Sequence, residues 1–161
     1  MNEKLISLIK TIELNSRLVN NCFENIDQST AENRINNKTN SMIFILIHLV
    51  DARYFFLKII GSEIQSPYFE ITKNIKSIDG FKEYPPLNEI LEAWNKSTEL
   101  LINNFKSINS EKLNSLSEIK FPINDDTLLG SITFGVQHES FHIGQLSLLR
   151  KHFGFPAMSY N

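Results

Sequence analysis

Hydrophobic residues recur at intervals of three and four along much of the chain, a spacing that places them on one face of an α-helix. The first such segment runs from Leu5 to Ile26 and carries its charged residues on the other side. The second begins near Ser41 and ends at Gly61, a residue type that commonly follows the last turn of a helix. Its first half is apolar nearly all round, so we expect this helix to be deeply buried.

A long connection and a third helix come next. Residues 62–86 contain three prolines and one glycine and show no sustained period. This composition predicts an irregular connection that holds only short turns. The third helix follows Pro86 and carries an apolar stripe that includes Trp94 and Phe105. We expect Trp94 to belong to the core.

The last helix is expected after Asp125 and Asp126, because acidic residues suit both the cap and the positive dipole of a helix N-terminus. It should end at Gly154, and a short turn is expected before it at residues 110–117. No segment shows the alternation of a β-strand. Four amphipathic helices in a chain of this length predict an all-α four-helix bundle that forms a single domain, residues 1–161.

The composition indicates the expected cellular location and the classes of partner that are not expected. The formal net charge is −2 and Lys and Arg are scattered, so we expect no nucleic-acid partner. The longest apolar run, residues 42–50, is about half of the roughly 20 residues that span a bilayer, and no signal peptide is evident, so we expect no membrane partner. Cys22 is the only cysteine, which excludes an internal disulfide and a thiolate-rich zinc cluster and favours the cytoplasm.

The sequence HESFH at residues 138–142 matches the H-E-x-x-H pattern of zinc proteases. On a helix, His138 and His142 lie about 40° apart on one face and about 6 Å apart along the axis, so both imidazoles reach one metal ion. The plain alternative is that the two histidines share a buried polar cluster. A partner histidine on another helix would favour the metal.

A zinc protease is disfavoured because its third ligand is missing. No acid follows His142, and His152 lies about 15 Å further along the same helix. The extended metzincin pattern fails as well, since Leu148 occupies the position of the third histidine. A di-iron bundle is also disfavoured, because it needs a second Glu-x-x-His element and Ile45 stands three residues before His48.

His48 supplies the partner that the histidine pair needs. It lies in the middle of the second helix among apolar residues, where an imidazole must find a hydrogen-bond partner or bind a ligand. With His138 and His142 it completes a set of three nitrogen ligands that holds Zn²⁺ or Ni²⁺ and leaves one position open. The sequence therefore predicts a three-histidine metal site.

Two stretches, HLVDARYF from His48 and HESFHIGQLSLLRKHFG from His138, resemble the DinB/YfiT-like superfamily of four-helix bundles. The resemblance covers essentially the whole chain, and its most specific part is the H-x-x-x-H-x-G-Q core. It implies that His48, His138 and His142 bind a divalent metal, and it further implies a homodimer and a small-molecule substrate. Characterised members include transferases and isomerases that use a low-molecular-weight thiol.

The resemblance leads us to expect a thiol-dependent S-transferase or related transferase that uses an open metal site. Two alternatives remain, a metal-dependent hydrolase and a non-catalytic metal-binding or interaction bundle. A divalent metal lowers the pKa of a bound water or thiol, which suits either enzyme. A cavity that reaches the open position favours an enzyme, whereas a fourth protein ligand favours a structural metal.

Three further residues are candidates to support the site. Gln145, one turn beyond His142, either orients a ligand or substrate or bonds to the backbone as a buried amide. Asp51, one turn beyond His48, either accepts an imidazole proton or pairs with a Lys or Arg. Glu139 is a candidate general base, although its position at the edge of the ligand face favours contact with a neighbouring helix.

Small residues recur on the back of the last helix, at Thr133, Ser140, Gly144 and Ser147. They allow another helix to approach closely, either from within the bundle or from a second subunit. His152 lies near the end of this helix, where the dipole favours a cation, so we expect it on the surface and outside the metal site.

Overall fold

The computed structural model describes residues 2–75, 77–81 and 83–161; the predicted domain and connection also include residues 1, 76 and 82, which lie outside the described part. The described residues form helices and no β-strand, so the predicted all-α fold is confirmed. The four long helices are α1 (Glu3–Phe23), α3 (Met42–Ile59), α5 (Leu87–Ser107) and α7 (Leu128–His152). The short ones are α2 (Gln28–Glu32), α4 (Phe69–Thr72), the 3-10 helix η1 (Ile78–Gly80) and α6 (Ser110–Asn114).

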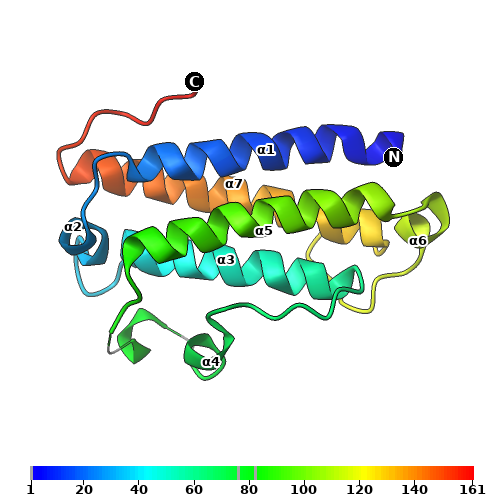
Figure 1. Ribbon diagram of the computed structural model, residues 1–161, viewed down its shortest axis with the longest axis horizontal. Helices are drawn as coiled ribbons and strands as arrows, with labels where there is room; N and C mark the ends of the chain where they lie inside the picture. The colour runs from blue at the N-terminus through cyan, green and yellow to red at the C-terminus, as the bar shows by residue number, and fades with distance from the viewer. Residues whose placement is uncertain (1, 76, 82) are drawn as a thin grey trace.

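The four long helices form a bundle in which each packs against two others. Both α1 and α3 contact α5 and α7, so α1 and α3 lie at opposite corners. Figure 1 shows that α3 and α5 run in one direction and that α1 and α7 run in the other. Because α3 and α5 are parallel, the chain between them must return along the bundle, which explains the long irregular connection. The short helices α4 and η1 are the turns within it.

Local signals end α3 at Gly61 and begin α7 after Asp126 as predicted, but the residue that caps α7 differs from the one expected. The Ser41 side chain accepts a hydrogen bond from a backbone N–H in the first turn of α3, and Gly61 follows its last turn with a φ of 97°. The N-cap of α7 is Thr127, whose hydroxyl accepts a hydrogen bond from the backbone N–H of Gly130. Asp125 instead accepts hydrogen bonds from the N–H and hydroxyl of Thr127. The acidic residue therefore supports the cap and is not the cap itself.

The expectation that α3 is buried nearly all round its first half is wrong along one stripe. Phe44 and Asp51 are half-buried, and His48 and Phe55 are exposed. These positions recur every three to four residues and so share one face of the helix. The other long helices pack on the remaining sides of α3, so this face lies outward, and its edge meets α7 where His48 contacts His138. Trp94 is fully buried in the core, as predicted.

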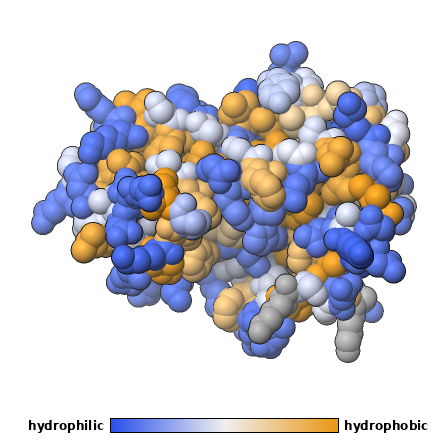
Figure 2. Space-filling view, turned by 180° about the vertical axis from the view of Figure 1, so that it is seen from behind, coloured by the Kyte–Doolittle hydropathy of each residue, from blue (hydrophilic) through white to orange (hydrophobic). Residues whose placement is uncertain are grey.

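The surface mixes apolar and polar residues. On the face opposite to that of Figure 1, hydrophobic residues are interspersed with hydrophilic ones (Figure 2). Among the described residues, none of the helices combines the length and apolar character that a membrane span requires. Two large apolar side chains, Phe141 and Leu148, are exposed on α7. Gly144 lies between them, and a Cβ atom there would meet no atom within 4 Å, so none of the described helices packs against it.

Candidate metal centre

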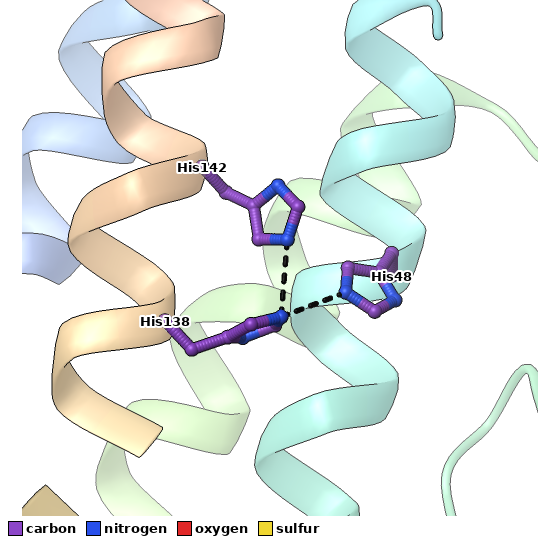
Figure 3. Close-up of side chains that lie close together, drawn as sticks. All are labelled: His48, His138 and His142. Atoms are coloured by element: carbon purple, nitrogen blue, oxygen red, sulfur yellow. Dashed lines mark hydrogen bonds between the residues drawn. The ribbon is translucent and has the colours of Figure 1, made fainter. Parts of the chain in front are cut away.

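Three histidines from two antiparallel helices converge on one point between α3 and α7 (Figure 3). The Nε2 atom of His138 lies 3.2 Å from Nε2 of His48 and 3.1 Å from Nε2 of His142. Potential ligand atoms of all three lie within 4.8 Å of one another. The fold therefore brings together the three residues that the sequence singled out.

The positions of these histidines on their helices explain the convergence. His138 and His142 are one turn apart on α7, and both are half-buried. His48 faces them from the outward stripe of α3 and is exposed. This corrects, at His48, the expectation that the helix is deeply buried. The site consequently lies at the surface of the bundle, where small molecules can reach it.

All three imidazoles favour their neutral form. Desolvation by neighbouring side chains, followed by the adjacent imidazoles, lowers the pKa of His48 to about 4, although part of this side chain remains open to solvent. Desolvation is also the main cause that lowers the pKa values of His138 and His142 below the ordinary 6.5. Neutral imidazole is the form that donates a lone pair to a metal, so at neutral pH these residues are ready to act as ligands.

Gln145 orients one of the three rings. Its Oε1 atom lies 2.7 Å from Nδ1 of His142. Because the amide oxygen accepts the Nδ1–H proton, the lone pair of His142 Nε2 is left to point toward the other two histidines. Of the two roles considered for Gln145, its contact with the imidazole supports that of orienting a ligand.

The donor set fits a divalent ion of the zinc type. A tetrahedral ion with bonds of about 2.0–2.1 Å holds its ligand nitrogens about 3.3 Å apart. Two of the three Nε2–Nε2 separations, 3.1 and 3.2 Å, are close to this value, and the ligand atoms of all three residues lie within 4.8 Å of one another. Three neutral imidazoles with one position left free form a ligand set that both Zn²⁺ and Ni²⁺ accept.

Asp51 has neither of the partners expected from the sequence. Its carboxylate accepts a hydrogen bond from the hydroxyl of Ser66, in the connection that folds over α3. Among the described residues, no histidine, lysine or arginine side chain hydrogen-bonds to it. Burial raises the pKa of Asp51, against the opposing effect of its hydrogen bonds with Ser66 and Thr72. Asp51 therefore ties the connection to α3 beside the histidines.

The contacts of Glu139 correct its candidacy as a general base. Its carboxylate is buried and forms two hydrogen bonds with the guanidinium of Arg53 on α3, Oε1 with Nε at 2.6 Å and Oε2 with Nη2 at 3.1 Å. The side chain thus faces neighbouring helices, as its position on α7 favoured. With both oxygens held by Arg53, the carboxylate is not free to take a proton from a substrate beside the histidines.

This ion pair lies at the centre of a buried polar network that joins all four long helices. Asn15 on α1 donates a hydrogen bond to Glu139 Oε2 at 3.1 Å. Arg53 donates to the Thr98 hydroxyl on α5 at 2.5 Å, and its guanidinium lies 3.3 Å from the centre of the Trp94 ring. Sequence reasoning missed Arg53. The available signal is a single arginine within an apolar helix, which requires a buried partner.

Two other residues lie outside the site. Cys22 is buried on α1, and burial raises the pKa of its thiol to about 12, so it is not a thiolate near neutral pH. His152 is the last residue of α7 and is exposed, as predicted. Neither belongs to the group of three histidines.

Cavities lie on the outward side of α3, and one of the two described below adjoins the histidines. One of about 310 Å³ is lined by His48, His138 and Asp51 together with apolar side chains. A larger one of about 730 Å³ lies between α3 and the connection and shares Asp51 and Phe55 with the first. The three-histidine group therefore borders space in which a small molecule can bind.

The family is shown by comparison with known proteins. Residues 1–156 match a family model described as "Protein of unknown function (DUF1572)". No curated protein matches the chain. The match includes the four long helices and all three histidines. Because it spans nearly the whole sequence, the chain belongs to the DUF1572 family.

Proposed function

We propose that this protein is a DinB/YfiT-like metal-dependent enzyme, specifically a thiol-dependent S-transferase, in which His48, His138 and His142 hold Zn²⁺ or Ni²⁺. The observation that carries the proposal is the convergence of three Nε2 atoms beside a cavity that two of these histidines line. A divalent ion bound there supplies positive charge that lowers the pKa of a low-molecular-weight thiol in the open position.

The neighbouring side chains favour an open site. Each residue considered as a fourth ligand is otherwise engaged, since Asp51 binds Ser66 and Glu139 binds Arg53. Cys22 is a buried thiol on another helix. None of these three belongs to the group of close ligand atoms, so we infer that water or substrate takes the fourth position.

The ligands themselves suit an anionic partner. The three imidazoles are neutral and add no negative charge to the site, so they do not repel an incoming thiolate. Gln145 holds His142 in the orientation that presents Nε2. These residues therefore prepare a position for a sulfur ligand next to the 310 Å³ cavity.

A hydrolase is the second candidate. Asp51 lines the same cavity as His48 and His138, and burial raises the pKa of its carboxyl, which suits a proton acceptor for water. We favour the transferase because Asp51 is already held by Ser66. A non-catalytic bundle is favoured least, because the histidines border a cavity and lack a fourth protein ligand among the residues considered.

Cobalt substitution tests the proposal directly. We expect one Co²⁺ per chain and, on addition of a small thiol, an intense absorption from sulfur-to-metal charge transfer. The alcohol analogue of the same thiol serves as the matched control and should leave this region of the spectrum unchanged. A cobalt spectrum that does not respond over a wide range of thiol concentrations would contradict the transferase and leave the hydrolase or a non-catalytic metal site.

We also propose that the protein is a cytoplasmic homodimer joined through the exposed side of α7. Phe141 and Leu148 are exposed there, and Gly144 leaves room for the close approach of a second helix. Light scattering should give twice the mass of the chain, and Leu148→Glu should shift the protein toward the monomer. A monomer at all concentrations of the unaltered protein would contradict this arrangement.

A further inference from the structure

Phenylalanine side chains form much of the wall of the 310 Å³ cavity beside the histidines. Four lining residues come from α3, α7 and the segment between α6 and α7: Phe55, Phe56, Phe121 and Phe134. The remaining lining residues are His48, Asp51, Ala52 and His138. The cavity therefore offers an apolar surface next to two of the three candidate metal ligands.

Three of these phenylalanines stack in a row that ends at a histidine. The ring centres of Phe56 and Phe121 are 5.6 Å apart, and those of Phe121 and Phe134 are 4.9 Å apart, with planes inclined by 25° in both pairs. Phe134 in turn stacks on His138, with ring centres 6.1 Å apart and planes inclined by 27°. A flat apolar group bound against this row lies beside the candidate metal position.

The wall is held in place by the packing of α7 and by backbone hydrogen bonds. A Cβ atom at Gly135 would lie 2.7 Å from the ring of Phe56, so only glycine lets α7 approach that ring without displacing it. The segment that carries Phe121 is closed by the backbone N–H of Ser117, which donates to the carbonyl of Asp126 at 2.9 Å. The aromatic wall is therefore formed before a ligand arrives.

The lining selects against anionic groups. Among the described residues it includes no lysine or arginine, and its one acid is Asp51, so an anionic group would meet a carboxylate with no compensating cation from these lining residues. Lys58 and Lys73 instead line the neighbouring cavity of about 730 Å³. A volume of about 310 Å³ exceeds the roughly 150 Å³ that encloses a benzene ring, and so admits one ring with a short substituent.

We infer that the 310 Å³ cavity is the binding subsite for an aromatic group of the substrate that carries no negative charge. This identification of the ligand as a substrate rests on the proposed function. Binding of the aromatic group itself requires only the wall described above, so the two proposals can fail separately.

Fluorine NMR titration of the chelator-treated protein tests the subsite. Treatment with chelator matters because a carboxylate ligand could otherwise bind a metal at the histidines. We expect 4-fluorobenzyl alcohol to bind at least about tenfold more tightly than 4-fluorobenzoate, because the two ligands share a ring and differ in charge. Equal affinities, or tighter binding of the benzoate, would overturn the inference.

A second experiment fills the cavity by mutation and measures the loss of ligand binding. Ala52→Leu adds bulk to a half-buried lining residue and should weaken binding of the alcohol by at least about tenfold. Ala93→Leu is the matched control, since Ala93 is half-buried on α5 and lies outside this lining. Circular dichroism shows whether each variant is folded. If Ala52→Leu does not fold, Phe121→Ser should produce the same loss by removing the middle ring of the row.

The outcomes separate the subsite from the proposed function. Unchanged binding in folded Ala52→Leu overturns the subsite even if the cobalt protein binds thiols. Selective binding of the neutral ring that is lost in Ala52→Leu but kept in Ala93→Leu supports the subsite even if thiols leave the cobalt spectrum unchanged.

Discussion

Arg53 and Glu139 form a doubly hydrogen-bonded ion pair in the core of the bundle. Glu139 lies between His138 and Ser140 on α7, so it is the immediate neighbour of a candidate metal ligand. The pair fixes the position of α7 against α3 at the level of the histidines. Since His138 and Glu139 share one turn of helix but face different sides, the buried pair and the candidate metal centre depend on the same placement of that turn.

Removing the acid alone should strongly destabilise the protein. Glu139→Leu leaves the buried guanidinium of Arg53 without its partner, so we expect the free energy of unfolding to fall by about 3–5 kcal/mol. The double variant Arg53→Met with Glu139→Leu should recover much of this loss, because no charge is then left unpaired. Urea denaturation measures both. Glu99→Ala, in an exposed pair with Lys96, is the control and should change little.

Each of the three histidines should be needed for metal binding. We expect one divalent ion per chain in the unaltered protein and a sharp fall in metal content on changing His48, His138 or His142 to Ala, because each supplies one converging nitrogen. Elemental analysis after dialysis measures this. His152→Ala is the control, and equal metal content in all four variants would refute the site.

Gln145 should strengthen metal binding without contacting the metal. Gln145→Leu removes the acceptor for the Nδ1–H of His142, so we expect metal affinity to fall by about 10–100-fold. Competition with a chromogenic chelator measures the affinity. Gln137→Leu, at an exposed position on the same helix, is the matched control. Equal affinities in the two variants would show that His142 does not need this hydrogen bond.

Acid should release the metal only well below the ordinary pKa of histidine. The pKa of free His48 is about 4 rather than 6.5, so protons compete weakly for its nitrogen as the pH falls through 6.5. For the same reason the unfolded chain binds protons that the folded chain does not, and the metal-free protein should lose stability as the pH falls from 6.5 toward 4. Metal content and urea midpoints across this range test both statements, and metal loss centred on pH 6.5 would contradict the first.

The local pattern of the sequence determined the helices and the pairing of two histidines. The period of three to four residues placed the long helices, and the four-residue spacing of His138 and His142 put both on one face, because helix geometry alone fixes these relations. The short helix α2 was not predicted, because it opens the polar, Asn-rich stretch of residues 28–40 and its five residues are too few to show a period.

Only the tertiary structure decided which side chains meet across helices. The outward stripe of α3 that exposes His48 arises because the other helices cover only part of α3. The apolar composition of this helix gave no sign that one side is exposed. Asp51 hydrogen-bonds to Ser66 in the returning connection, and Glu139 forms an ion pair with Arg53. The partners of such buried charges are determined by packing between segments that are far apart in the chain. Spacing along one helix cannot reveal such partners, because they depend on how the helices are rotated against one another.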